Sequence, residues 1–317
     1  MVLTSRAKYR IFSPAFVTSK RPYILLVIII ILWGLNFIIS RFLCGIEPIR
    51  ISGVLFALLR YVLGALTLIV IIAYKRKSIH VIRDEIRPYR NLILLSALFS
   101  AIFVIGLHTS TEFITSGTSS ILVNLNPVVV LVFGVLFLKE RLSFIKVLGF
   151  LLGLIGGLIF LWTSITIVPG IEIGILLALV STFAWGAYTI TLHYLEGADR
   201  YVVITVTLVT SSLLLFAFNL GLMFEGFTPI FVLDAFSISG ILITGILSSG
   251  MGYVMYFTAV EILGASHASS FLFLVPFVSV AGDFLLGEPP APIILVAGLI
   301  AIIGVGLIRM SGFEEDN

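Results

Sequence analysis

Residues 21–43 read RPYILLVIIIILWGLNFIISRFL, an apolar run bounded by Arg21 and Arg41. As a helix, about 20 such residues span the hydrocarbon core of a bilayer. Similar runs, separated by charge, Gly or Pro, continue along the chain. They predict ten membrane helices, near 23–43, 53–74, 91–111, 116–138, 144–163, 171–193, 201–224, 237–258, 264–286 and 291–310. The fold class expected is therefore an all-α polytopic membrane protein.

The composition supports the same class. Of 317 residues, 60% are hydrophobic and 11% charged, against roughly 25% charged in a soluble domain. Ten spans use about 200 residues, which leaves no room for a soluble catalytic domain. One cysteine, Cys44, excludes an intramolecular disulfide, and four His without Cys at ligand spacing predict no metal site. We expect no cofactor and, at a formal charge of +3 without a basic stripe, no nucleic-acid partner.

The distribution of Lys and Arg predicts the orientation. With residues 1–22 as a basic cytoplasmic tail and 311–317 as an acidic cytoplasmic tail, Lys and Arg lie on the cytoplasmic side, except Arg41 and Arg50 outside and Arg60 within a span. Positive charge in short loops stays in the cytoplasm. We therefore predict an integral protein of the cell membrane with both termini cytoplasmic.

The two halves of the chain repeat one another. A shift of 148 to 152 residues brings punctuation residues into register: Trp33-Gly34 with Trp185-Gly186, Pro127 with Pro276, and Glu140 with Glu288. Residues 23–163 and 171–310 then form two five-helix repeats. Because five is odd, the second repeat enters the membrane inverted, which is typical of transporters.

Small residues recur on the last helix of each repeat. Gly149, Gly153 and Gly157 follow one face of the fifth helix, and Ala297 and Ala301 occur in the tenth. Such faces allow close helix approach. We expect them to pack inside the bundle, and a homodimer through these helices is the alternative.

Several motifs resemble the EamA-like family of the drug/metabolite transporter superfamily. In the first half they are Trp33-Gly34 followed by Phe37, Arg60, Asn126-Pro127 and Leu138-Lys139-Glu140-Arg141-Leu142; in the second, Ala259-Val260-Glu261, Leu263-Gly264-Ala265 and Gly287-Glu288. The resemblance covers about 23 to 310. It implies ten helices in two inverted repeats, a central cavity, and export or exchange of small-molecule metabolites. The family fixes the class of protein and leaves the cargo open.

Interrupted helices at matching positions mark the substrate site of many transporters. Pro127 and Pro276 lie near the middle of their spans and free the carbonyls of Val123 and Leu272. Lipid cannot satisfy these carbonyls, so they face protein, water or cargo. For either proline alone, the alternative is a simple helix kink whose free carbonyl is hydrogen-bonded by a neighbouring helix.

Polar and aromatic residues at this depth are the candidate substrate-binding residues: Trp33, Asn36, Asn124, Asn126, Trp185 and Tyr188. Trp33 and Trp185 equally suit helix packing. Asn124 and Asn126 are about 200° apart on a regular helix, so we expect at most one of them to face the cavity.

Ionisable residues inside spans complete the predicted site. Arg60 lies about 10 Å deep and suits a substrate carboxylate or phosphate; the alternative is structural pairing with Glu112 or Asp283. His108, Glu112 and Asp283 are the candidates for proton coupling.

These residues favour a secondary transporter of a small amphipathic metabolite, an amino acid or a related compound, working by alternating access. A sugar-phosphate or nucleotide-type exchanger is the alternative. Phosphate recognition usually recruits several Lys or Arg, however, and Arg60 alone is available within the spans. An intramembrane enzyme lacks a paired Asp or a Ser with a nearby His base. A receptor leaves the inverted repeat unexplained.

Overall fold

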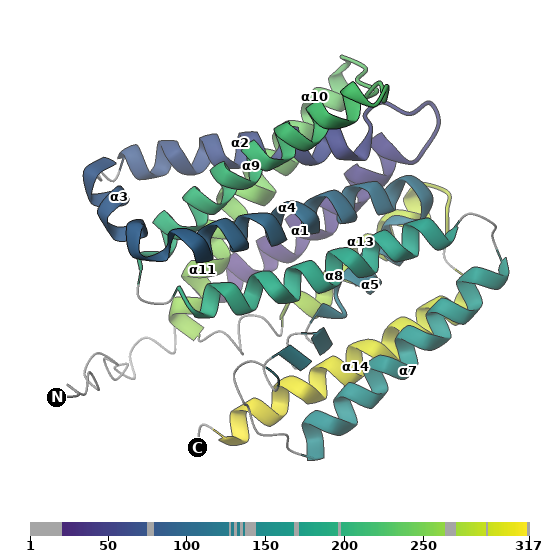
Figure 1. Cartoon of the computed structure of the whole chain (residues 1–317). Coiled ribbons are helices and arrows are strands. Elements are labelled where there is room, and N and C mark those ends of the chain that lie inside the picture. The colour runs from purple at the N-terminus through teal and green to yellow at the C-terminus, as the bar shows by residue number, and fades with distance from the viewer. Residues whose placement is uncertain are drawn as a thin grey trace.

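The computed structural model describes residues 21–74, 79–126, 128–129, 132–133, 136, 144–167, 171–195, 198–263, 271–289 and 291–315. These residues form a bundle of helices (Figure 1). The first repeat contains α1 (Arg21–Cys44), α2 (Gly53–Tyr74), α3 (Ile79–Ile86), η2 (Arg87–Tyr89), α4 (Arg90–Phe113), α5 (Ser116–Val123) and α7 (Phe144–Ile167). The second contains α8 (Ile171–His193), α9 (Arg200–Phe224), α10 (Ala235–Leu242), η3 (Ile243–Met251), α11 (Gly252–Leu263), η4 (Phe271–Leu274), α13 (Val275–Leu285) and α14 (Pro292–Glu315).

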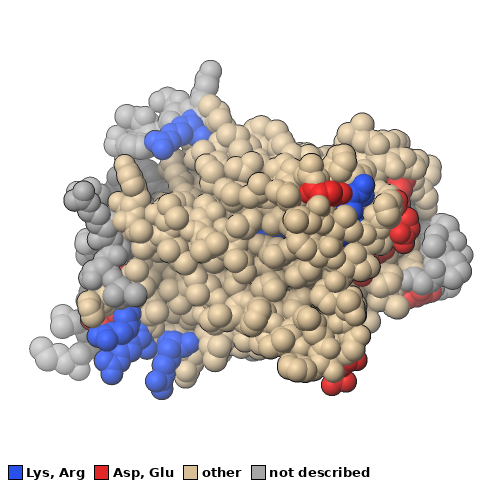
Figure 2. Space-filling model, turned by 90° about the horizontal axis from the view of Figure 1, so that it is seen from above, with Lys and Arg blue, Asp and Glu red and all other residues tan. Residues whose placement is uncertain are grey.

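The described helices have the lengths that a bilayer requires. Six stretches of 22 to 32 residues are long and apolar enough to cross a membrane. Many outward side chains are apolar, for example Val70 and Leu213, whereas many Ser and Thr side chains are buried. Figure 2 shows the same partition, with an uncharged belt between two charged ends. The chain is an integral membrane protein.

Two regions differ from regular spans. The predicted helix 116–138 is interrupted after Val123, where α5 ends, and helical residues resume at Asn126. The predicted helix 237–258 is α10, η3 and α11 in succession, and η3 is a nine-residue π-helix. Such π segments often mark functional sites, and η3 carries Ser249, which contacts Arg60. The start of the predicted span 264–286 lies outside the described residues.

Contacts between helices follow the repeat. If the repeats are exchanged, α1 corresponds to α8, α2 to α9, α4 to the α10–α11 segment, α5 to α13, and α7 to α14. The pairs α2–α9, α5–α13 and α7–α14 each join a helix to its own counterpart. The contacts α1–α11 and α4–α8 exchange with one another, as do α2–η3 and α4–α9. This pattern is the two-fold arrangement that inverted repeats produce.

Two ends of the bundle are distinguished by their loops. We call the end that carries residues 45–52, 225–234 and 286–289 the Pro48 end, and the end that carries α3 the α3 end. At the Pro48 end, the two repeats meet through an antiparallel bridge between Ile51 and Phe231 and an ion pair between Arg50 and Asp234. At the α3 end, the backbone N–H of Asp199 donates to Glu85. Both ends therefore carry contacts between the repeats.

Local capping explains several helix boundaries. The Asp199 carboxylate accepts from Tyr201 N at the start of α9, and the Asp234 carboxylate accepts from Ser237 N at the start of α10. That backbone bond is the largest of the effects that lower the pKa of Asp234, with smaller contributions from the Ser237 hydroxyl and from Arg50. Gly226 and Gly287 adopt positive φ just beyond α9 and α13, as C-terminal glycines do.

Gly149 and Gly153 of α7 pack against α14, in agreement with the prediction that small residues of these helices pack inside the bundle. Helices α7 and α14 lie side by side (Figure 1). A Cβ built on Gly304 would approach Gly149 O and Gly153 N to 2.5 Å. Only glycine fits at this backbone-to-backbone contact.

The substitution Gly304→Ala is therefore expected to destabilise the α7–α14 pair, because backbone atoms cannot yield to a methyl group. Overpacking of this kind costs about 1–3 kcal/mol, and we expect a lower melting temperature in detergent. Gly306→Ala is the matched control, since a Cβ there meets nothing within 4 Å. Equal melting temperatures for the two variants would contradict the contact.

Candidate functional site

A cavity of about 60 Å³ lies at the centre of the bundle. Residues of both repeats line it, from α1, α2, α4, α5, α8, α11, η4 and α13. Among the predicted site residues, those that line it are Trp33, Asn36, Arg60, Asn124, Asn126 and Trp185. Phe37, Phe103, Leu107, Val123, Tyr253, Leu272 and Val275 complete the lining. The structure thus brings most of the predicted residues together.

The two tryptophans are fixed by aromatic neighbours on corresponding helices. Trp33 lies against Tyr253 and Tyr256 of α11, with ring centroids 6.1 and 5.4 Å away. Trp185 of α8 lies 4.6 Å from Phe103 of α4. Since α1–α11 and α8–α4 are equivalent pairs, the indoles occupy related positions in the two repeats. They give the cavity apolar, π-rich walls.

Each indole is also fixed by a further contact. Trp33 Nε1 donates to Ser248 O at 3.1 Å, and Trp185 packs against Tyr188 at 5.5 Å. Tyr188 is buried and does not line the cavity, and its hydroxyl has no partner among the described residues. The Asn36 Oδ1 atom, on a side chain that does line the cavity, also lacks a partner there.

Arg60 presents part of its guanidinium to the cavity. The side chain is buried, its Nε donates to Ser249 Oγ at 2.7 Å, and its Nη1 donates to His108 Nε2 at 3.0 Å. Within the described residues, Nη2 has no protein acceptor. Glu112 accepts from Gly53 N, and Asp283 accepts from residues of α5, so neither acid pairs with Arg60. The predicted structural pairing of Arg60 with Glu112 or Asp283 is therefore wrong.

The contacts of His108 fix its protonation state. Because a guanidinium only donates, His108 Nε2 accepts and the ring proton lies on Nδ1. That N–H donates to Ser40 Oγ at 2.8 Å, and Ser40 in turn donates to Thr111 Oγ1 at 2.6 Å. Thr111 completes the chain by donating to His108 O. A second proton on the ring would sit on Nε2 and point at the Arg60 guanidinium, which cannot accept it and is itself positively charged. The geometry therefore disfavours His108 as a proton carrier.

The end of α5 explains how both Asn124 and Asn126 reach the cavity. Asn124 Nδ2 donates to Ser120 O at 2.8 Å, and Asn126 Nδ2 donates to Val123 O at 3.0 Å. The prediction that at most one would face the cavity is wrong, because it assumed a regular helix. Backbone carbonyls only accept, so these contacts assign the amide nitrogens and leave both Oδ1 atoms without a protein donor among the described residues.

The two prolines play related parts. Pro127 itself lies outside the described residues, but Val123 O, the carbonyl that it cannot bond, accepts from Asn126. Pro276 is buried in the first turn of α13, where a missing N–H is tolerated. It does not line the cavity, but Leu272 and Val275 beside it do. The helix breaks therefore border the cavity from both repeats.

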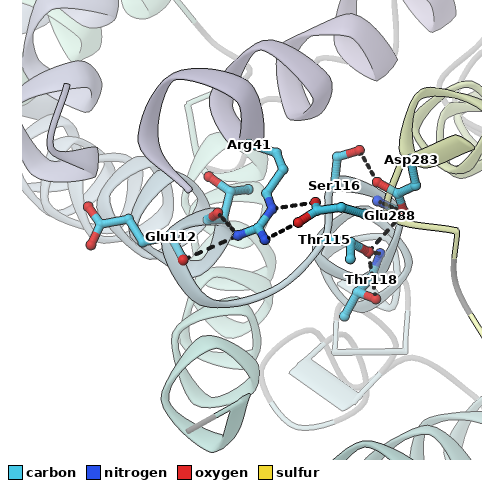
Figure 3. Close-up of polar contacts among 9 residues, drawn as sticks. Arg41, Glu112, Thr115, Ser116, Thr118, Asp283 and Glu288 are labelled. Atoms are coloured by element: carbon cyan, nitrogen blue, oxygen red, sulfur yellow. Dashed lines mark hydrogen bonds and ion pairs between the residues drawn. The ribbon is translucent and has the colours of Figure 1, made fainter. Parts of the chain in front are cut away.

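A polar network lies at the Pro48 end (Figure 3). Arg41 donates through Nε and Nη2 to both carboxylate oxygens of Glu288, and through Nη1 to the carbonyls of Thr111 and Glu112. Asp283 accepts from residues at the start of α5. This ion pair was not predicted from the sequence, although Glu288 lies between the predicted spans 264–286 and 291–310.

A larger groove of about 560 Å³ lies between α4 and α8. Its lining is almost wholly apolar and includes Leu95, Phe99, Val180 and Phe183. Leu95, Val180 and Phe183 are exposed on the lateral surface, so lipid acyl chains suit the groove. We therefore place the candidate substrate site in the central cavity, where polar groups converge.

The chain is similar to known proteins along most of its length. It matches the EamA-like transporter family twice, over residues 20–162 and 172–310. The uncharacterized transporter YvbV of Bacillus subtilis is 29% identical over 90% of each chain. The uncharacterized protein PA1977 of Pseudomonas aeruginosa is 32% identical over 92% of this chain and 95% of its own length.

Two further similarities bear on function and fold. A probable terminal-alkyne amino-acid exporter of Streptantibioticus cattleyicolor is 24% identical over 90% of this chain and 92% of its own. A solved crystal structure superposes with a TM-score of 0.60 at 17% identity, over 91% of this chain and 97% of that one, which shows the fold alone. From the two matched segments and these relatives, we conclude that the chain belongs to the EamA-like transporter family.

Proposed function

We propose that this protein is a secondary transporter and not an enzyme, and that it moves a small amphipathic metabolite, an amino acid or a related compound. Export or exchange by alternating access is the mechanism. The observation that carries the proposal is the central cavity, where Arg60 Nη2 and the amide oxygens of Asn124 and Asn126 have no protein partners among the described residues.

The cavity offers complementary groups to a zwitterion. The Arg60 guanidinium suits a carboxylate. The oxygens of Asn36, Asn124 and Asn126 suit an ammonium or another donor. The aromatic walls suit an apolar side chain. The amino-acid exporter among the relatives supports this class of cargo.

A sugar phosphate is the weaker candidate. Phosphate recognition usually recruits several Lys or Arg, and Arg60 is the only one that lines the described cavity. The described lining of the cavity therefore lacks a second cation for a phosphate group.

The cavity of about 60 Å³ is small for an amino acid, so cargo binding requires helices to move apart. Rocking of one repeat against the other supplies this movement. We propose that the Pro48 end faces the outside of the cell membrane and that both termini are cytoplasmic. The positive-inside rule supports this orientation: Arg83, Arg87 and Arg90 are at the α3 end.

Counterflow in proteoliposomes tests the proposed function, because exchange reveals a cargo without knowledge of the driving force. Vesicles loaded with an unlabelled amino acid are expected to accumulate the same amino acid in labelled form. Labelled nucleosides and sugar phosphates serve as the comparison. Accumulation of a sugar phosphate without any amino acid would contradict the proposed cargo, and empty liposomes provide the control.

The substitution Arg60→Lys tests the role of the guanidinium. Lysine keeps the charge but ends in a single nitrogen, so it cannot offer a carboxylate the two parallel N–H donors of the planar guanidinium. We expect at least a tenfold increase in the KM for exchange, which is the equivalent of about 1.4 kcal/mol. The surface variant Arg83→Lys is the control, and we expect a smaller change in its KM. An unchanged KM in Arg60→Lys would exclude bidentate carboxylate recognition by Arg60.

A further inference from the structure

Asp283 is a buried carboxyl group that joins the two repeats. It lies on α13 and is fully buried. Its Oδ2 accepts from Thr115 Oγ1 at 2.8 Å and from Gly117 N at 2.9 Å, both at the start of α5. Its Oδ1 lies 2.5 Å from Ser116 Oγ. Because a Cβ on Gly117 would come within 2.5 Å of Oδ2, a glycine there permits the close approach of α5 to α13.

No cation is bonded to this carboxyl group among the described residues. At the Pro48 end, where Asp283 lies, the surrounding elements carry three charged groups, Arg41 on α1, Glu112 at the end of α4, and Glu288 after α13; the described part of α5 has none, and Arg21 of α1 and Arg90 of α4 lie at the opposite end. Arg41 is held by Glu288 and by two backbone carbonyls. Glu288 itself places a second negative charge near Asp283 and donates its backbone N–H to Asp283 O. An ionised Asp283 would thus be a buried charge without a counter-ion, which is costly.

The hydrogen atoms around Ser116 point to the same conclusion. Ser116 Oγ lies 3.1 Å from Ser279 O and 2.5 Å from Asp283 Oδ1. A backbone carbonyl only accepts, an ionised carboxylate only accepts, and a serine has one hydrogen to donate. With Asp283 ionised, one of these two contacts lacks a hydrogen. A proton on Oδ1 completes the set, because Asp283 then donates to Ser116 and Ser116 donates to Ser279 O.

We propose that Asp283 is the proton-binding site of the transport cycle, occupied when the Pro48 end is closed and emptied when that end opens. The proton enters from water at the Pro48 end and returns there, while Thr115 and Gly117 remain bonded to Oδ2 in the closed state. Opening separates α13 from α5 and hydrates the carboxylate. Lowering the pH on this side therefore favours the closed state, because the closed state binds one more proton. The inference rests on the alternating access of the proposed function.

Distance measurements between spin labels at the Pro48 end test the site without knowledge of the cargo. In a Cys44→Ala background, labels replace Phe113 at the end of α4 and Leu285 at the end of α13, both of which are exposed. In lipid nanodiscs, acidification from pH 8.5 to 5.5 is expected to raise the short-distance population. The closed-to-open ratio changes by at most about tenfold per pH unit, the limit for one proton.

Asp283→Asn mimics the neutral acid, since its amide donates to Ser116 and its oxygen accepts from Gly117 N. We expect this variant to show the short distance at every pH. Glu112→Gln is the matched control, a carboxylate at the same end that accepts from a backbone N–H, and it should keep the pH response. Size-exclusion chromatography and circular dichroism verify that each variant is folded.

Two results would overturn the proposal. One is a labelled parent whose distances do not change with pH, and the other is an Asp283→Asn variant that responds to pH as the parent does. Neither result depends on counterflow, so a wrong proton site and a wrong cargo are distinguished. A pH-dependent shift that requires Asp283, without amino-acid counterflow, would refute the proposed cargo and leave the proton site standing.

Discussion

The hydrocarbon core of a bilayer offers no hydrogen-bond partner, and this constraint organises the centre of the molecule. Each polar group that interrupts a span must find a partner inside the protein or face a hydrated cavity. Arg60 meets this requirement through Ser249 of η3 and His108 of α4, which use Nε and Nη1 and leave Nη2 for the cavity. Val123 O meets it through the Asn126 side chain. Asn36 Oδ1 and Arg60 Nη2, which have no protein partner among the described residues, belong to side chains that line the cavity.

The two-fold arrangement supplies the mechanical basis for transport. Helices that pair with their own counterparts, such as α2–α9 and α5–α13, lie on the pseudo-symmetry axis. The indoles of Trp33 and Trp185 repeat the same packing on either side of that axis. Because the repeats are inverted, a contact that closes one end has a counterpart that closes the other. The proposed alternating access requires two conformations of similar free energy, and such symmetry is consistent with them.

Much of the fold was predictable because it depends on composition and periodicity. Apolar runs of bilayer length, and the coincidence of Trp33 with Trp185 and Pro127 with Pro276, indicated the spans and the two repeats. The packing of Gly149 and Gly153 against α14 followed from small-residue spacing. These signals lie along single helices, so the sequence carries them directly.

The site was harder to predict because its geometry depends on departures from regular helices. The ending of α5 at Val123 placed both Asn124 and Asn126 at the cavity, although helical spacing separated them. The π-helix η3 brings Ser249 to Arg60 and replaces the acidic partners that sequence reasoning offered. The pairing of Arg41 with Glu288 joins residues 247 positions apart. Such contacts arise from tertiary structure and leave no local pattern.

The central claim is that this cavity opens to each side of the membrane in turn. In a Cys44→Ala background, Asn36→Cys places a single thiol at the cavity wall, and a membrane-impermeant thiol reagent is applied to oriented vesicles from either side. The account predicts modification from both sides, slowed on both by transported cargo. Modification from one side only, with and without cargo and at every pH, would contradict it.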